Sequence, residues 1–401
     1  MVAEPHGTKR SNLGEVVILF LRLGITAFGG PAAHVAIMED EVVQRRRWIT
    51  QEKFLDLLGA VNLIPGPNST EMAIYLGYLR AGWLGLVLGG MCFILPAMLM
   101  VGGIAWAYVR YGGLPQFQAS LYGVKPVVIA VILQALWGLG PRAAKTKFLA
   151  VIGLLAVVAA GYFAVDALAV IVVGGAVAGL VRGWTWERGK RSKPIFVMLV
   201  IAGGILAFSH FATLLGNITE VHSGLQPLFF YFLKIGSILY GGGYVLFAFL
   251  QSDLVARWHW LTSAQLLDAT AVGQVTPGPL FTTATFIGYV LGGVPGAIVA
   301  TAGIFLPSFV LIAISGPLIP RLRRSPIAGA FLDGVNVASL ALMAVVTWQL
   351  GRAAIFDVTT VLLAILSAIL LMRFRINSAW LVLGGAAVGM IVQMVTVLGK
   401  H

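Results

Sequence analysis

The stretch Asn62-Leu63-Ile64-Pro65-Gly66-Pro67-Asn68-Ser69-Thr70-Glu71 interrupts an apolar region, and the stretch Gln274–Thr283 contains the same Pro-Gly-Pro at an offset of 212 residues. Proline breaks a helix because it lacks a backbone donor, so each Pro-Gly-Pro divides its apolar region into two pieces. In the first half the pieces are residues 51–64 and 68–79, each too short to span about 30 Å of hydrocarbon alone. The pattern predicts a helix that is broken near the middle of a membrane.

The composition agrees with a polytopic membrane protein. Of the 401 residues, 59% are hydrophobic and 10% are charged, and the mean hydropathy is +0.93. Uncharged apolar stretches separate short clusters of charge, which predicts membrane-spanning helices. Residues 148–163 are apolar on every side, whereas the strands of an outer-membrane barrel alternate. We therefore expect an all-α membrane protein in contact with lipid, without a soluble catalytic domain.

Several partners and cofactors are excluded by the same composition. The net charge of +12 does not indicate a nucleic-acid partner, because no domain-sized polar surface exists to present a basic patch. The single cysteine, Cys92, excludes an internal disulfide, and the six histidines show no metal-ligand spacing. We expect no metal and no other cofactor. The sequence leaves the oligomeric state open between a monomer and a homodimer.

The chain is a duplication. The offset of 212 residues pairs Arg22 with Lys234 and Gly29-Gly30 with Gly241-Gly242, in addition to the two Pro-Gly-Pro motifs. We divide the chain into an N-terminal transporter repeat (1–182), a basic linker with an unpaired apolar segment (183–215), and a C-terminal transporter repeat (216–401). If each broken helix makes one net crossing, each half crosses six times and the linker segment brings the total to about 13. That single linker crossing would make the two halves inverted-topology repeats.

The basic residues agree with inversion, because cytoplasmic loops retain Lys and Arg. Basic loops follow Arg142 and Arg182 in the first half, but Arg321 and Arg373 in the second, which are different places in the repeat. This distribution predicts a cytoplasmic N-terminus and an external C-terminus. The cluster Arg45-Arg46-Arg47 disagrees, because it falls outside in this topology. The alternative is a re-entrant hairpin at Pro-Gly-Pro, which would make the halves parallel.

The helix that starts behind each break is a candidate anion site. The first amides of a helix lack partners, and its dipole places about half a positive charge at that end. Two such starts at half-membrane depth predict a central binding site. Its expected residues are Pro65, Gly66, Asn68, Ser69 and Thr70 in the first half and Gly278, Thr282 and Thr283 in the second. The alternative is a simple kink with capping side chains.

Three cations are further candidate ligands of the anion. Arg22 and Lys234 lie inside apolar runs, where a charge costs about 3 kcal/mol and usually has a function. Lys125 lies in another apolar segment but has no basic counterpart in the second half. The alternatives are snorkelling to the interface or pairing with a buried carboxylate. The pairs Gly29-Gly30 and Gly241-Gly242 would let a ligand approach the backbone, or they simply end helices.

Glu71 is the one asymmetric carboxylate near the expected site. It follows the first Pro-Gly-Pro by four positions, and its repeat partner is Thr283. We consider two roles for it, a proton carrier and a counter-ion of Arg22 or Lys125.

The motifs Phe28-Gly29-Gly30-Pro31, Trp48-Ile49-Thr50 and Asn62–Glu71 resemble the chromate ion transporter family in its long two-domain form. The resemblance covers nearly the whole chain. It implies a multi-pass protein of the bacterial inner membrane that exports chromate from the cytoplasm, confers chromate resistance and has sulfate as a look-alike substrate. The second half departs from the motif at Tyr240–Gly243 and Gln274–Leu280, so the resemblance carries less weight there.

The residues themselves also point to an oxyanion exporter that works by alternating access. A tetrahedral oxyanion needs several donors and a positive potential, which two helix starts with Arg22 and Lys234 could supply. Expelling a dianion from a negative cytoplasm releases about 4.6 kcal/mol per 100 mV. The alternatives are a transporter of sulfate or another oxyanion, an intramembrane enzyme, and a channel. An enzyme would need clustered catalytic groups, and a channel would pass more than about 10³ ions per second.

Overall fold

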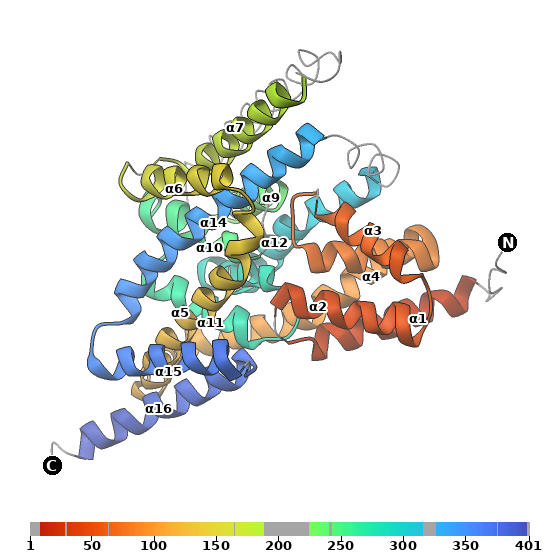
Figure 1. Ribbon diagram of the computed structural model, residues 1–401. Helices are drawn as coiled ribbons and strands as arrows, with labels where there is room; N and C mark the ends of the chain where they lie inside the picture. The colour runs from red at the N-terminus through yellow and green to blue at the C-terminus, as the bar shows by residue number, and fades with distance from the viewer. Residues whose placement is uncertain are drawn as a thin grey trace.

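The computed structural model describes residues 9–28, 30–62, 64–163, 165–187, 224–239, 243–315, 326–374 and 376–398, and every regular element in these ranges is a helix. The first half contains α1 (Lys9–Thr26), α2 (Gly30–Glu39), η1 (Asp40–Arg45), α3 (Gln51–Val61), α4 (Asn68–Tyr111), α5 (Pro115–Ala143), α6 (Lys147–Gly161) and α7 (Ala167–Glu187). The second half contains α9 (Leu225–Ile238), η2 (Gly243–Val245), α10 (Leu246–Leu250), η3 (Gln251–Arg257), α11 (Ser263–Val275), η4 (Leu280–Thr282), α12 (Thr283–Ser315), α14 (Pro326–Ala354), α15 (Val358–Phe374) and α16 (Ser378–Leu398). The expected all-α class is confirmed for this part of the chain (Figure 1). The apolar linker segment at 195–215, the loop at 321–324, and Gly29, Gly241 and Gly242 lie outside the described residues.

The first half opens with a helical hairpin made of α1 on one side and α2 with η1 on the other. The imidazole Nε2 of His34 lies 3.0 Å from the carbonyl oxygen of Ala27 near the tip. Arg22 in α1 forms an ion pair with Glu41 in η1 further from the tip. Along α1 the residue numbers rise toward the tip, and along α2 and η1 they rise away from it. The two arms of this helical hairpin therefore run antiparallel.

Helix α4 is a second hairpin rather than one straight rod. Ala81 and Gly82 have non-helical backbone angles, and Gly82 has a φ of +67° that favours glycine. A Cβ atom on Gly77 would overlap the carbonyl oxygen of Gly85, so the two arms on either side of this turn pack closely. The arms are residues 68–80 and 83–111, and the first is close to the piece 68–79 expected from the sequence. Helix α12 turns in the same way at Gly292-Gly293.

The Pro-Gly-Pro segment of the first half also reverses the chain. The guanidinium of Arg80, at the end of the first arm of α4, lies 5.4 Å from the ring of Trp48, which precedes α3. Arg80 also bonds Glu15 near the start of α1 at 2.9 Å. Both ends of the α3–Pro-Gly-Pro–α4 unit therefore lie at one end of the half. The turn differs from the sequence prediction, in which the broken helix crosses the membrane once. The predicted total of 13 crossings depends on that helix. The length of a segment does not show whether the chain continues or turns back, so the sequence could not decide between the two.

The second half repeats this arrangement. A cavity of about 170 Å³ is lined by Gly224 and Leu225 at the start of α9, Trp260 before α11, and Leu291 and Gly292 at the turn in α12. These positions correspond to the start of α1, to Trp48 and to the turn in α4. The two halves therefore share one fold, as the sequence repeat requires.

The two long helices α5 and α14, which are repeat partners, run antiparallel. The Nζ atom of Lys145, just after α5, lies 2.7 Å from Asp333 near the start of α14. At the other end the hydroxyl of Tyr122, near the start of α5, donates to Asp357 just after α14 at 2.6 Å.

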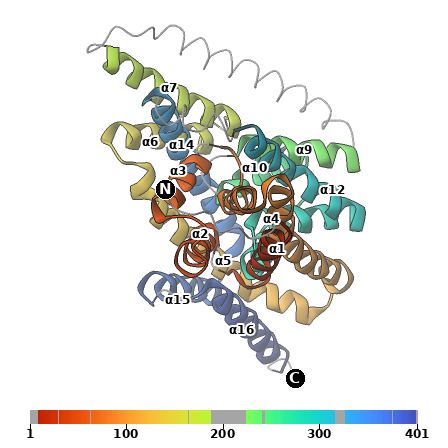
Figure 2. The same ribbon diagram turned by 90° about the vertical axis from the view of Figure 1, so that its right-hand side faces the viewer.

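The last two helices of each half pack on the long helix of the other half. Helices α6 and α7 contact α14, and helices α15 and α16 contact α5. Figure 2 shows α7 alongside α14. Glycines allow the close approach, since a Cβ atom on Gly123 of α5 would overlap the carbonyl oxygen of Gly385 in α16. The halves are thus interlocked rather than joined side by side.

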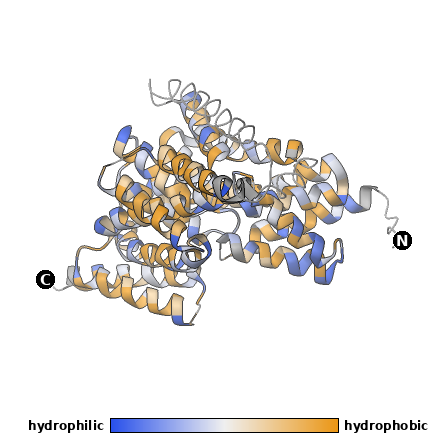
Figure 3. Cartoon of the chain, turned by 45° about the horizontal axis from the view of Figure 1, so that its top comes forward, coloured by the Kyte–Doolittle hydropathy of each residue, from blue (hydrophilic) through white to orange (hydrophobic). Residues whose placement is uncertain are grey.

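The outer surface is apolar. Five helical segments of the described chain are long and apolar enough to cross a membrane, namely Asn68–Tyr111, Pro115–Ala143, Leu280–Ile314, Gly329–Ala354 and Ser378–Val395. Large hydrophobic side chains such as Trp137, Leu154 and Ile365 are more than half exposed. In Figure 3 orange predominates along the helices. Such a surface is expected of helices that face lipid.

Replacing Gly123 with Ala should lower the stability by about 1–3 kcal/mol, because the new methyl group meets the backbone of α16. Gly138→Ala in the same helix is the matched control, since its Cβ would have no neighbour within 4 Å. That control should match or exceed the wild type, because Ala is favoured over Gly in a helix by about 1 kcal/mol. Melting temperatures of the detergent-purified proteins measure both effects. A Gly123→Ala protein as stable as the control would contradict the interlocked packing.

Candidate functional site

The two halves meet at a pair of reciprocal hydrogen bonds. The amide of Gly66 donates to the carbonyl of Leu239 at 2.8 Å, and the amide of Gly278 donates to the carbonyl of Ala27 at 3.0 Å. Gly66 and Gly278 are repeat partners, and so are Ala27 and Leu239. The contact is therefore the same from both sides, as a pseudo-two-fold axis requires. Each Pro-Gly-Pro turn is held by the break that follows the opening helix of the other half.

Only glycine fits at the centre of each turn. Gly66 and Gly278 have φ values of +140° and +91°, which side chains on L-residues rarely tolerate. A Cβ atom on Gly66 would overlap a carboxylate oxygen of Glu71 and lie 2.8 Å from the hydroxyl of Ser308. On Gly278 it would lie 2.6 Å from the Cβ of Ala97. Since Ala97 and Ser308 are repeat partners, these contacts are symmetric too.

The helix start in the first half is polar and under-satisfied. Helix α4 begins at Asn68, and the next side chains, Ser69, Thr70 and Glu71, are buried. The hydroxyl of Thr70 makes no hydrogen bond within the described residues, and the carboxylate of Glu71 has no cationic partner there; the hydroxyl of Ser308 is its polar neighbour. Buried polar groups are usually paired. These atoms are therefore available to a ligand, a water molecule or a proton.

The helix start in the second half differs from the first. The hydroxyl of Thr282 donates to the carbonyl of Pro279, and the hydroxyl of Thr283 donates to the carbonyl of Leu280. Both threonines are buried, but their side chains satisfy the backbone of their own turn. The structure thus brings the two expected helix starts to one seam between the halves, with free polar atoms at the first start and capped ones at the second.

Arg22 does not reach the Pro-Gly-Pro turns; its side chain pairs with Glu41 at 2.6 Å. This is the carboxylate pairing that the sequence left open as an alternative. Burial disfavours the charged form of Glu41, but hydrogen bonds from Arg22 and Arg46 and the nearby guanidinium charges outweigh it. They hold the pKa of this carboxyl below its ordinary value.

Lys234 likewise has an acidic neighbour, which the sequence analysis did not identify. The repeat partner of Glu41 is Asp253, which is buried and lies in the electrostatic field of Lys234. No ion pair joins Lys234 to Asp253 among the described side chains. The signal available in the sequence was an acid at matching positions of the two halves. Each half therefore has a buried carboxylate near the cation of its opening helix. Among the described residues, an ion pair joins the two groups in the first half but not in the second.

Lys125 also has a carboxylate partner. Its Nζ atom lies 3.3 Å from Asp268 in α11, and the hydroxyl of Tyr108 donates to the same carboxylate at 3.0 Å. Asp268 is 4% exposed and Lys125 is 17% exposed, so the pair is largely shielded from water. Because α5 and α11 belong to different halves, this pair is a second link across the seam.

Pro65 and Gly30, which the sequence also predicts for the site, lie at backbone turns. Pro65 precedes the Gly66 turn, and Gly30 starts α2 with a φ of +79°. The carbonyls of Ala27 and Leu239 could not have been found from the sequence, because backbone acceptors leave no side-chain signal.

Comparison with known proteins identifies similar chains. The sequence profile of a family described as chromate transporter matches residues 14–180 and 226–390. The chain is 34% identical to the chromate transport protein of Cupriavidus metallidurans over 96% of this chain and 94% of that protein. It is 32% identical to the probable chromate transport protein of Synechococcus elongatus, over 89% of each chain. It is also 32% identical to the chromate transport protein of Pseudomonas aeruginosa, over 83% of this chain and 80% of that protein. No solved structure matches.

Lys125→Met should destabilise the protein by about 3–5 kcal/mol, because it leaves the charge of Asp268 buried without its cation. The double variant Lys125→Met/Asp268→Asn should recover most of that loss, since neither charge remains. Lys145→Met is the matched control, because its pair with Asp333 is exposed and should be worth no more than about 1 kcal/mol. Thermal unfolding of the purified variants provides the measurement. Equal losses in the single and double variants would show that the pairing itself does not matter.

Proposed function

The chain belongs to the chromate transporter family, and from that premise we propose that it exports chromate from the bacterial cytoplasm as a multi-pass protein of the inner membrane. Homologous transporters and five long apolar helices support an integral membrane transporter rather than an enzyme. The observation that supports the proposal is the reciprocal seam, where the Pro-Gly-Pro turn before each helix start is bonded to the opposite half at Leu239 and at Ala27. Sulfate, with the same tetrahedral shape and charge, is the alternative cargo.

We propose that the repeats have inverted topology, with a cytoplasmic N-terminus and an external C-terminus. Support comes from the repeat partners α5 and α14, whose contacts at Lys145 and at Tyr122 make them antiparallel. Because the opening hairpin and the Pro-Gly-Pro unit both turn back, four helices of each half cross the membrane. One crossing by the linker segment then gives nine in total, an odd number that still inverts the halves.

This topology removes a conflict in the charge distribution. Trp48, Arg80 and Glu15 lie at one end of the first half, so the adjacent cluster Arg45-Arg46-Arg47 lies there too. In the proposed topology that end faces the cytoplasm, where Lys and Arg accumulate. The through-going broken helix had placed these arginines outside.

The proposed cargo site is the seam itself. The amides of Gly66 and Gly278 are held by carbonyls of the opposite half. Separation of the halves at this seam would free both amides and open the helix starts at Asn68 and Thr283. Amides and hydroxyls at a helix start bind oxyanions well. Alternating access would then follow from opening this contact first toward one side and then toward the other.

Lys125, Arg22 and Lys234 would contribute positive potential rather than direct contacts in the closed state. Each lies close to a carboxylate, so cargo at the seam would have to draw the cation away from Asp268, Glu41 or Asp253 to contact it directly. Gly30, which starts α2 close to Ala27, belongs to the same proposal, and a role for Gly29, Gly241 and Gly242 stays a prediction from the sequence.

The direction of transport has an energetic basis. With the cytoplasm negative, expulsion of a dianion releases about 4.6 kcal/mol per 100 mV, whereas uptake must overcome the same amount. Export therefore needs little further coupling. We propose Glu71 as the carrier of any coupled proton, because an unpaired charge buried there is costly and protonation removes that cost.

Inside-out vesicles that contain the protein should accumulate chromate, and vesicles without it should not. A membrane potential, positive inside these vesicles, should raise the initial rate, because the dianion moves with the field. Competition by sulfate distinguishes the two cargoes. Accumulation of sulfate but not chromate would replace the proposed cargo, and no accumulation of either would overturn the function.

Glu71→Gln should make chromate transport independent of the pH gradient while exchange of chromate across symmetric solutions continues. The exposed Glu52 in α3 supplies the matched control, Glu52→Gln, which should leave the pH dependence as in the wild type. Initial rates in inside-out vesicles at several imposed pH gradients provide the measurement. An unchanged pH profile in Glu71→Gln would eliminate the proton role.

Cysteines placed at Lys145 and Arg323 should both be labelled from the cytoplasmic side by a membrane-impermeant maleimide. The background is Cys92→Ala, which removes the single native cysteine. A cysteine at Tyr162, after α6, is the opposite-side control and should react only from outside. Labelling of positions 145 and 323 from different sides would refute inversion.

A further inference from the structure

Three guanidinium groups converge on one carboxylate in the first half. Glu41 accepts contacts at one oxygen from Arg22 at 2.6 Å and from Arg45 at 3.2 Å, and at the other oxygen from Arg46 at 3.3 Å. Arg45 also pairs with Asp40 at 2.7 Å. Glu41 is 6% exposed, whereas the side chains of Arg22 and Arg45 are 47% and 65% exposed. The buried Glu41 therefore holds the guanidinium groups in place, and the side chains of Arg22 and Arg45 stay exposed.

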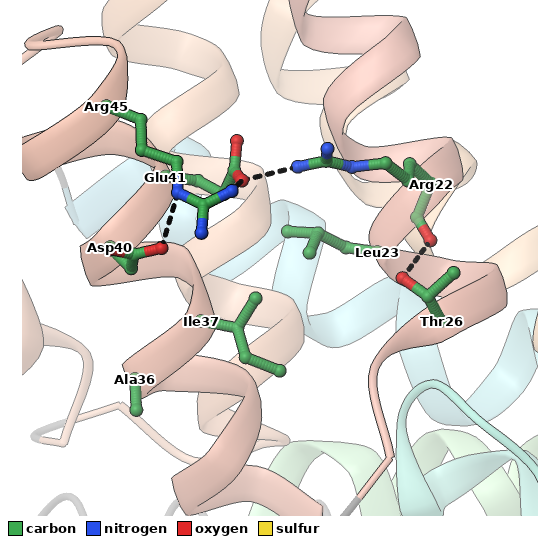
Figure 4. Close-up of a pocket in the computed structure, with 8 residues that line it drawn as sticks. All are labelled: Arg22, Leu23, Thr26, Ala36, Ile37, Asp40, Glu41 and Arg45. Atoms are coloured by element: carbon green, nitrogen blue, oxygen red, sulfur yellow. Dashed lines mark hydrogen bonds and ion pairs between the residues drawn. The ribbon is translucent and has the colours of Figure 1, made fainter.

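A groove opens directly over this cluster. Its cavity of about 460 Å³ is bordered by Arg22 and Thr26 of α1 and by Ile37, Glu41 and Arg45 of the facing helices. Figure 4 shows Arg22 and Arg45 reaching Glu41 from opposite walls, with Leu23 and Ile37 between the walls. Each guanidinium has five N–H donors, so donors remain for a ligand after Glu41 is bonded.

One end of the groove lies close to the seam in sequence. Thr26 lies on its wall, and the next residue, Ala27, accepts the hydrogen bond from the amide of Gly278 through its carbonyl. An anion bound in the groove would therefore lie beside the helix end that contacts the other half.

The charges around the groove favour an anion. The groups in direct contact are the three arginines with Glu41 and Asp40, which leaves one net positive charge. Guanidinium forks suit tetrahedral oxyanions, because they offer paired donors to adjacent oxygens. The second half keeps basic partners for Arg22 and Arg45, namely Lys234 and Arg257, and both act electrostatically on Asp253. The repeat partners of Arg46 and Arg47 are Trp258 and His259, so three neighbouring arginines occur at this position of the repeat in the first half alone.

We infer that this groove is an entrance site at which a tetrahedral oxyanion dianion, chromate or sulfate, first binds between Arg22 and Arg45 before it reaches the seam. The assignment of the groove to the cytoplasmic side rests on the proposed function and topology; the binding itself does not. Glu41 has two opposing effects on the ligand. It holds the guanidiniums side by side, and its own charge competes with the oxyanion.

Glu41→Gln tests the inference, because glutamine keeps the size and one acceptor oxygen but removes the competing charge. Sulfate binding to the full-length protein in detergent, measured by calorimetry at fixed ionic strength, should tighten by about tenfold. Arg45→Gln should weaken it by a similar factor, and as an exposed substitution it should leave the fold intact. Glu52→Gln, at an exposed carboxylate of α3 that does not border the groove, is the matched control and should leave the sulfate affinity unchanged.

The outcomes separate this inference from the proposed function. An entrance site predicts that Arg45→Gln raises the KM for chromate in inside-out vesicles while kcat stays near that of the wild type. Unchanged sulfate affinity in both Glu41→Gln and Arg45→Gln would overturn the entrance site, whether or not chromate is exported. If sulfate binding responds as expected but no vesicle accumulates chromate or sulfate, the site stands and the transport proposal fails.

Discussion

The arrangement of this protein depends on how interrupted helices satisfy their backbone within an apolar surrounding. A helix that breaks there exposes amides and carbonyls that water cannot reach, and each unsatisfied group costs several kcal/mol. Here two breaks satisfy each other, since the amide of Gly66 bonds the carbonyl of Leu239 and the amide of Gly278 bonds that of Ala27. Neither half can close its own broken helices alone. Each half therefore depends on the other for hydrogen bonds at its break.

The halves are interlocked through close packing of their helices. Apolar helices in a bilayer gain little from hiding hydrophobic surface, so close packing at small residues has to hold them together. Gly123 meets Gly385 across one pair of helices, and Gly174 meets Gly334 across the equivalent pair. The last two helices of each half thus pack against the long helix of the other half. The contact between the halves therefore extends well beyond the central seam.

The two halves share a backbone but differ in charge. Glu71 and Lys125 have no ionisable counterpart in the second half, and only the first half surrounds its buried carboxylate with three arginines. The two halves therefore present different electrostatic surroundings at equivalent positions of the repeat. The fold supplies the symmetry, and a few side chains remove it.

The sequence alone determined the helical class, the duplication and the positions of the two breaks. Each of these depends on local chemistry, namely apolar length, the effect of proline on a helix, and the recurrence of special residues at one offset. The piece 68–79 occurs almost as the sequence predicts it, because the helix starts directly behind Pro67 and ends at Arg80. The direction of each piece was a different matter. Length and composition are the same for a helix that continues and for one that turns back, so the re-entrant course of the chain at Pro-Gly-Pro had to come from contacts such as Arg80 with Trp48. The partners of Arg22 and Lys125 likewise lie in other helices, at Glu41 and Asp268, and only packing brings those charges together.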